Sequence, residues 1–164
     1  MIKKNLFVSL YFIGILLLGV VHFSADPDFT FSHLAIHIPA IVGVMSIFFA
    51  ILVPLLKKRF SDVKPRALVS LHHVFSYTGW TSILLHMIFL FVKIKKYTLY
   101  IPAFTDWATI LSKSGPIAVI LIIIGALALL FRKKWRTFQT IHAFNIIAFS
   151  WICVHGIFKD QALQ

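Results

Sequence analysis

The chain has 164 residues, of which 60% are hydrophobic, 15% aromatic and only 13% charged, and its formal net charge is +11. A soluble domain is about one-quarter charged, so this composition excludes an ordinary soluble globular protein. The net charge does not indicate a nucleic-acid partner, because the basic residues lie in short segments beside apolar runs, where membrane topology and lipid headgroups account for them.

Five apolar runs predict an all-α fold, a polytopic membrane helical bundle with about five transmembrane helices in a single domain over residues 1–164. In hydrocarbon every backbone amide must be paired within its own segment, which favours helices, and a spanning helix needs about 20 apolar residues. The second, third and fifth runs reach this length, whereas the first and fourth are short. The predicted helices cover residues 5–21, 34–56, 67–92, 116–131 and 138–158.

The first run, from Asn5 to Val21, also has features of a signal peptide. Lys3 and Lys4 precede it, and the small residues Ser24 and Ala25 follow it. Its apolar stretch is longer than a usual signal core, so a retained helix is the preferred interpretation and cleavage is the alternative. In both cases the segment that follows emerges on the far side of the membrane.

Basic residues fall mainly between alternate runs, which is a topology signal. Of the sixteen Lys and Arg residues, eleven lie on one side, and five lysines lie in the opposite loops. The positive-inside rule therefore places the N-terminus in the cytoplasm and the C-terminus outside the cell (inner) membrane. The segment from Pro102 to Ser114 is predicted to be an outer loop or an interfacial segment. The eleven residues are Lys3, Lys4, Lys57, Lys58, Arg59, Lys64, Arg66, Arg132, Lys133, Lys134 and Arg136.

Four of the eight histidines form two pairs within the predicted helices. His72 and His86 lie fourteen residues apart on the third helix, and His142 and His155 lie thirteen apart on the fifth. At about 1.5 Å per residue, each pair spans about 20 Å, which gives one histidine level near each leaflet. Polar side chains at membrane depth are costly and are usually functional.

The third and fifth helices run in the same direction because a single span separates them. His72 therefore matches His142 in depth, and His86 matches His155. Two imidazoles at equal depth supply the two axial ligands of a six-coordinate haem iron. Two such levels predict two stacked haems and an electron path across the membrane. The alternative interpretation is that these histidines only form hydrogen bonds between helices.

The helical angles suit one pair better than the other. A gap of fourteen closes to within about 40° of whole turns, so His72 and His86 share a face. A gap of thirteen misses whole turns by about 140°, so His142 and His155 require a kink, a locally altered winding or rings that reach around the helix. His73 points about 100° away from His72 and is the alternative ligand at that level.

Two segments resemble the ferric reductase-like transmembrane domain family. This family includes the membrane parts of ferric reductases and NADPH oxidases and the haem subunit of bacterial methionine sulfoxide reductase systems. It has a histidine pair fourteen residues apart on the third helix, and a basic, Trp-containing loop before a helix with two histidines thirteen apart. The resemblance covers about residues 66–158, and the earlier part only by helix count. The matching stretches are Arg66-Ala-Leu-Val-Ser-Leu-His72-His73 to Leu84-Leu85-His86, and Lys134-Trp-Arg-Thr-Phe-Gln-Thr-Ile-His142 to Val154-His155.

The resemblance implies that His72 and His142 hold an inner b-type haem and that His86 and His155 hold an outer one. Family members commonly have a sixth helix, and many carry a cytoplasmic flavin and nicotinamide domain, but nothing in these 164 residues matches either. The resemblance therefore implies an oxidoreductase membrane subunit without flavin. Its electron donor would be a separate flavoprotein or quinol, and its outer acceptor a metal ion or a periplasmic oxidoreductase.

Two arginines lie near the inner ligands. Arg66 and Arg136 are within a helical turn or two of the inner histidines, so they either pair with haem propionates or anchor the cytoplasmic side of the protein.

Three further histidines lie at the outer side. His33 and His37 are four residues apart on one face of the second predicted helix, and His22 ends the first helix on the same side. These imidazoles form a candidate outer metal site for a substrate ion. The alternative is that they are interfacial histidines or contacts of the outer haem.

Three functions are consistent with these patterns. The first is transmembrane electron transfer through two b-type haems, the second a quinol-linked cytochrome b subunit, and the third a non-redox membrane protein such as a small metal transporter. The single cysteine, Cys153, excludes an intramolecular disulfide and a multi-cysteine metal site. A dithionite-reduced spectrum separates the third function from the other two.

Overall fold

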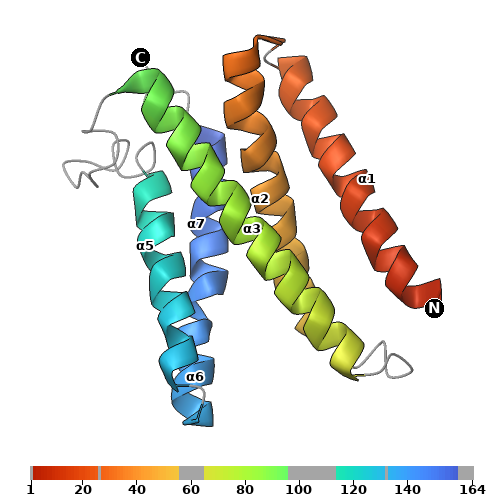
Figure 1. Cartoon of the computed structure of the whole chain (residues 1–164), viewed down its shortest axis with the longest axis vertical. Helices are drawn as coiled ribbons and strands as arrows, with labels where there is room; N and C mark the ends of the chain where they lie inside the picture. Colours follow the sequence, from red (N-terminus) through yellow and green to blue (C-terminus); the bar gives the residue numbers. More distant parts are fainter. Residues whose placement is uncertain (1, 26, 56–64, 96–113, 132, 159–164) are drawn as a thin grey trace. The chain divides into compact units, whose positions relative to one another are not determined.

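The computed structural model of the chain describes residues 2–25, 27–55, 65–95, 114–131 and 133–158 (Figure 1). Every regular element in these residues is a helix, which confirms the predicted all-α class. The chain divides into two compact units, residues 1–95 and residues 96–164. The single domain expected over the whole chain stays a prediction. The expected outer segment, residues 102–114, lies outside the described residues except Ser114, where a helix begins.

The first unit contains three long helices, which are α1 (Ile2–Ala25), α2 (Phe31–Leu55) and α3 (Pro65–Ile94). α1 and α3 extend beyond their predicted runs at both ends, whereas α2 begins three residues before its run and ends one residue before the end of it, within the usual uncertainty of helix boundaries. α3 begins at a proline, whose missing N–H costs nothing in the first helical turn. At 24 residues, α1 is long enough to cross a bilayer, although its apolar run alone is short.

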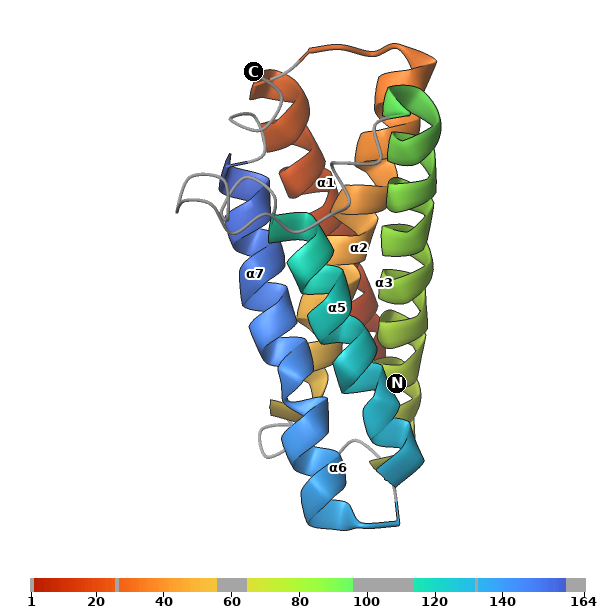
Figure 2. The ribbon, with the colours of Figure 1, turned by 90° about the vertical axis from the view of Figure 1, so that its left-hand side faces the viewer.

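The second unit contains α5 (Ser114–Leu127), the 3-10 helix η3 (Ala128–Phe131), α6 (Trp135–His142) and α7 (Phe144–Phe158). Figure 2 shows α5 and α7 side by side, with η3 continuing from α5 and α6 leading into α7. A 3-10 helix rises about 2.0 Å per residue, against about 1.5 Å in an α-helix. The short fourth run therefore extends to about 29 Å, close to the thickness of a bilayer core.

Four helices of the described residues are long and apolar enough to cross a membrane, and a fifth, shorter apolar segment covers Ile117–Leu127. Large apolar side chains on these helices face outward, such as Leu16 at 67% exposure and Val21 at 66%. Such an extended apolar surface is unfavourable in water and suits lipid. The helices thus indicate a membrane protein, as the sequence predicts. The four spans are Asn5–Ala25, Phe31–Leu55, Pro65–Lys93 and Arg136–Val154.

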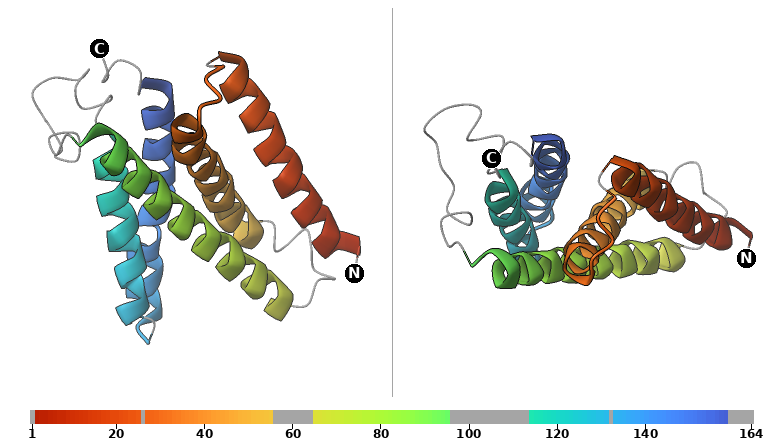
Figure 3. Two further views of the ribbon diagram at one scale, coloured as in Figure 1. Left: turned by 45° about the horizontal axis from the view of Figure 1, so that its top comes forward. Right: turned by 90° about the horizontal axis from the view of Figure 1, so that it is seen from above.

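α2 and α3 are antiparallel and form the most extensive contact in the first unit (Figures 1 and 3). Glycines stand at their crossing. A Cβ atom on Gly79 would lie 2.9 Å from Cγ1 and 3.3 Å from the backbone nitrogen of Ile47, and a Cβ on Gly43 would lie 3.0 Å from Cγ1 of Ile83. The absence of side chains therefore lets the two backbones approach closely, as small residues do in membrane helix pairs.

α1 joins this pair through an aromatic residue with a polar end. The ring of Tyr11 lies 5.0 Å from that of Phe75 and 5.6 Å from that of Phe49, measured between centroids. Its hydroxyl is 2.8 Å from Oγ of Ser46, and this hydrogen bond is buried. The bond satisfies both hydroxyl groups inside an apolar cluster. The cluster consists of Phe7, Tyr11, Phe49, Ala50, Val53, Leu68, Leu71 and Phe75.

The fifth predicted helix, residues 138–158, is interrupted. α6 ends at His142, and α7 begins at Phe144. Between them Ala143 accepts a hydrogen bond from the N–H of Ile146 at 2.9 Å, which is the i to i+3 spacing of a 3-10 turn. Such a turn rotates the chain by about 120° per residue, so three residues recover about 60° of the missing 140°. This turn supplies part of the distortion that the thirteen-residue gap requires, through an altered winding, which was one of the three alternatives.

The Gly79 crossing gives a stability prediction. Gly79→Ala adds a methyl group against Ile47, and we expect it to lower the free energy of unfolding by about 1–3 kcal/mol. Alanine also raises helix propensity by about 0.5–1 kcal/mol, so Gly19→Ala on α1 is the matched control, because a Cβ there meets no atom within 4 Å. Thermal unfolding of the two variants in one detergent measures the difference. Equal stability would mean that α2 and α3 do not need this close contact.

Candidate ligand histidines

Two histidines of α3 are held by backbone carbonyl groups of α2. Nδ1 of His72 lies 2.8 Å from the carbonyl oxygen of Ala50, and Nδ1 of His86 lies 2.8 Å from that of Ile36. Both rings are half-buried. In both histidines, therefore, Nδ1 is the ring atom that contacts a backbone carbonyl oxygen of α2, and the two distances are equal.

These bonds determine where each ring carries its proton. A carbonyl oxygen only accepts hydrogen bonds, so Nδ1 must be the donor in the rings of His72 and His86. In a neutral imidazole the other nitrogen, Nε2, then carries the lone pair that a metal ion requires. Histidines that bind metals nearly always have this arrangement, because the second hydrogen bond fixes the ring and raises its basicity.

The two levels are related by a regular register. His72, Gly79 and His86 follow one another at intervals of seven residues on α3. On α2 the intervals are the same from Ile36 through Gly43 to Ala50. Because the helices are antiparallel, the two carbonyl bonds lie symmetrically about the glycine crossing. Seven residues are about two helical turns, so each set shares one face.

A proline explains why one of these carbonyl groups is open to a side chain. In a regular helix the carbonyl of Ala50 would accept the N–H of residue 54, but residue 54 is proline and has no N–H. The imidazole of His72 supplies the missing donor. Sequence reasoning did not identify Ala50 and Ile36 as partners, although Pro54 inside an apolar run is a signal that a carbonyl four residues earlier lacks its usual donor.

His73, the alternative ligand, is in a different environment. Its side chain is exposed, and its ring lies 6.2 Å from that of Tyr77, measured between centroids. Since His72 is half-buried and held by α2, the geometry favours His72 as the residue with a fixed ring at this level.

In the second unit, His142 has a side-chain partner. Nδ2 of Asn145 lies 3.1 Å from Nδ1 of His142, and the amide packs against α5 at Gly125. An amide nitrogen only donates, so in this orientation Nδ1 accepts and the ring proton lies on Nε2. A 180° rotation of the amide would present its oxygen instead and reverse the proton position.

The remaining predicted site residues lie as follows. His155 belongs to α7, and its side chain lies outside the described residues. Arg66 and Arg136 are both exposed, near the starts of α3 and α6. The expected pairs, His72 with His142 and His86 with His155, each join one residue from each unit, and both pairs stay predictions.

Three imidazoles of the first unit come together at one end of α1 and α2. His22 lies in the last turn of α1, and His33 and His37 lie in the first two turns of α2. One ring nitrogen from each histidine lies within 4.8 Å of the others. The rings are stacked, with centroid separations of 4.1 Å for His33 and His37 and 4.5 Å for His22 and His37. The structure therefore brings together the three histidines that the sequence suggested as an outer site.

Asp28 stands beside this cluster. Its Oδ1 accepts the backbone N–H of Thr30 at 2.9 Å, and its Oδ2 is 3.5 Å from Nδ1 of His33. The hydrogen bond from Thr30 lowers the pKa of Asp28, and His33 contributes in the same direction. Asp28 is therefore a carboxylate that orients one member of the cluster.

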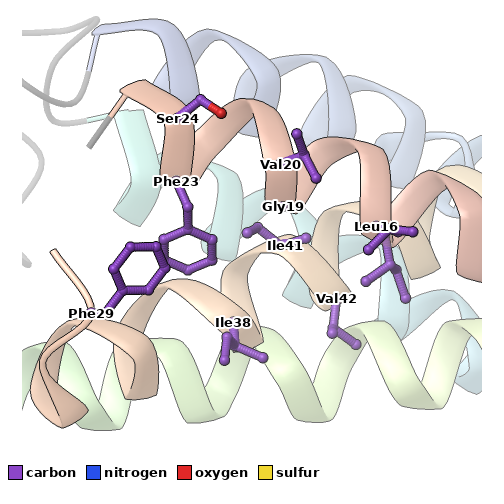
Figure 4. A pocket seen from close by; sticks show the side chains of 10 residues that line it. Leu16, Gly19, Val20, Phe23, Ser24, Phe29, Ile38, Ile41 and Val42 are labelled. Atoms are coloured by element: carbon purple, nitrogen blue, oxygen red, sulfur yellow. The ribbon is translucent and has the colours of Figure 1, made fainter. Parts of the chain in front are cut away.

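A groove lies next to the cluster between α1 and α2 (Figure 4). It has a volume of about 490 Å³. At one end the rings of Phe23 and Phe29 are stacked with their centroids 5.6 Å apart. The lining is apolar except for Ser24, so the groove matches a hydrocarbon chain and offers no chemistry to a polar substrate.

Comparison of this chain with protein-family models, with curated proteins and with solved structures found no match in any of the three.

The hydrogen bonds to α2 give a spectroscopic prediction. In haem-free protein labelled with ¹⁵N-histidine, we expect His72 and His86 to show a protonated Nδ1 and an Nε2 with a lone pair, because a carbonyl oxygen holds each Nδ1. Ring ¹⁵N chemical shifts, assigned with single-histidine variants, measure this, and the exposed His73 is the reference. Protonation at Nε2 of either anchored ring would contradict the assignment.

Proposed function

We propose that this chain is a membrane subunit that carries electrons across a bilayer on two b-type haems. The observation that supports the proposal most directly is the pair of hydrogen bonds from α3 to α2, which give His72 and His86 the same tautomer and the same fixed orientation. Both rings therefore have Nε2 available to a ligand, at two depths of one helix.

The spacing of the two anchored rings suits two separate haems. Fourteen residues of helix correspond to about 21 Å, so a single macrocycle does not reach both His72 and His86. In this proposal His72 and His142 would hold one haem, and His86 and His155 would hold the other. Haem bound in this way supplies reversible one-electron exchange, and the protein sets its potential through ligands, hydrogen bonding and burial.

The residues of the chain have defined tasks in this proposal. The carbonyl groups of Ala50 and Ile36 hold the rings and leave the lone pair on Nε2. Arg66 and Arg136 each lie six residues before an inner histidine, and both are exposed, so their guanidinium groups can reach haem propionates at the inner surface.

The role of Asn145 depends on which end of its side-chain amide faces His142. For His142 to bind iron through Nε2, its Nδ1 must carry the proton, so Asn145 must present its amide oxygen. Because the amide packs against α5 at Gly125, the same contact that positions Asn145 also controls the orientation of His142.

The electron donor in this proposal is a separate flavoprotein or quinol on the inner side, and the acceptor is a metal ion or a periplasmic oxidoreductase on the outer side. A quinol-linked cytochrome b subunit would use the same haem ligands, so the ligand tests below apply to it equally.

The haem content tests the proposal. We expect the purified chain to show b-type bands after reduction with dithionite and to contain about two haems. His72→Ala, His86→Ala, His142→Ala and His155→Ala should each lower the content to about one haem, because each removes one axial ligand. The pyridine haemochromogen assay measures this content.

His73→Ala is the matched control, because it removes a neighbouring exposed imidazole. We expect it to keep the full haem content. Absence of b-type bands in the unaltered protein would refute the proposed function, and loss of haem in His73→Ala would show that the assignment of the inner ligand to His72 is wrong.

The proposed topology has the N-terminus in the cytoplasm, and cysteine labelling tests it. In a Cys153→Ala background, we expect Pro27→Cys to react with a membrane-impermeant thiol reagent in intact cells. Lys133→Cys should react only after lysis, because the basic turn before α6 lies inside. Both positions are exposed, so lysed cells provide the control in which both should react. The opposite pattern would invert the topology.

A further inference from the structure

We infer that His22, His33 and His37 form a binding site for one divalent transition-metal ion, with Cu²⁺ as the most tightly bound. This site is distinct from the haem ligands, and the inference does not depend on the presence of haem. Imidazole is a preferred ligand of Cu, Zn, Ni and Fe, and at a given site Cu²⁺ binds most tightly among the divalent ions of the first row.

The helices bring the three side chains together for a structural reason. His33 and His37 are four residues apart and therefore lie on one face of α2. The chain reverses direction between α1 and α2, and this reversal places His22 opposite the face of α2 that carries His33 and His37. Thr30 helps to fix this return, because its N–H is bound by Asp28 and its carbonyl oxygen accepts the N–H of Leu34 at 3.0 Å.

The distances suit a common metal ion. Two adjacent imidazole nitrogens bound to one ion at about 2.0–2.1 Å lie about 2.9 Å apart in the tetragonal geometry of Cu²⁺ and about 3.3 Å apart in tetrahedral geometry. The ligand nitrogens of this cluster lie within 4.8 Å of one another, so the widest pair must close by about 1.9 Å at most for Cu²⁺. Rotations about the side-chain bonds of two histidines cover such a distance without movement of the helices.

The cluster is shielded from solvent on one side and has a carboxylate beside it. His33 is buried, with 6% of its surface exposed, and the Nε2 atoms of His22 and His33 are buried. The Asp28 carboxylate, 3.5 Å from Nδ1 of His33, directs the lone pair of that ring to Nε2.

The site lies beside the anchor of a proposed haem ligand. The carbonyl group that holds His86 belongs to Ile36, and its peptide bond continues directly into His37. A metal ion held by the cluster would therefore lie within one turn of α2 from the His86 anchor.

Copper titration of the full chain tests this site. The protein is purified through a tag without histidine, titrated with Cu²⁺ in detergent and examined by electron paramagnetic resonance, with metal content measured after gel filtration. We expect one Cu²⁺ per chain with splitting from imidazole nitrogens. We expect His22→Ala, His33→Ala and His37→Ala each to weaken binding by about tenfold or more, and the triple variant to lose the signal.

His73→Ala is the matched control, because it removes one exposed imidazole elsewhere in the same unit, and it should bind Cu²⁺ as the unaltered protein does. His22→Gln, a milder change, guards against misfolding of the triple variant and should also weaken binding. An unchanged copper spectrum in the triple variant, or less than one bound ion in the unaltered chain, would overturn the inference. Haem content measured on the same samples separates this outcome from a failure of the proposed function.

Discussion

The close contact between α2 and α3 is the constraint on which the candidate ligand geometry depends. An imidazole reaches across a helix interface to a backbone carbonyl only when the two backbones are near one another, and Gly43 and Gly79 make this approach possible. The two glycines stand midway between the levels of His72 and His86, so this one crossing point brings the backbones close enough for both hydrogen bonds. A larger side chain at that point would separate the helices and would lengthen the hydrogen bonds to His72 and His86 together.

Membrane location explains why the polar groups of the first unit are arranged in this way. In hydrocarbon an unpaired polar atom raises the free energy by several kcal/mol, so histidine, serine and tyrosine side chains must find partners in neighbouring helices. Tyr11 and Ser46 satisfy one another, and the anchored histidines use carbonyl groups of α2. Pro54 assists, because it removes a backbone donor and leaves the carbonyl of Ala50 to a ring. The same arrangement that satisfies the polar atoms fixes the rings in the form that binds a metal.

Much of the fold followed from composition and run length, because an apolar segment in lipid has only the helix as a solution. The five runs correspond to helices, but the position of the break at Ala143 was not predicted, because the thirteen-residue spacing of His142 and His155 required only some distortion along the helix or rings that reach around it. The ligand candidates His22, His33 and His37 also followed from spacing, and the structure gathers them. The partners Ala50, Ile36 and Asn145 were not predicted, because they depend on helix register and on side-chain packing, which a linear pattern does not encode.

α2 links the two kinds of candidate site. Ile36 lies between His33 and His37 in one turn of α2. The backbone of Ile36 and the side chains of the two histidines have different partners. The carbonyl group of Ile36 accepts the ring of His86, and the side chains of His33 and His37 lie in the cluster with His22. A displacement of this turn would therefore change the hydrogen bond between Ile36 and His86 and the geometry of the histidine cluster at once.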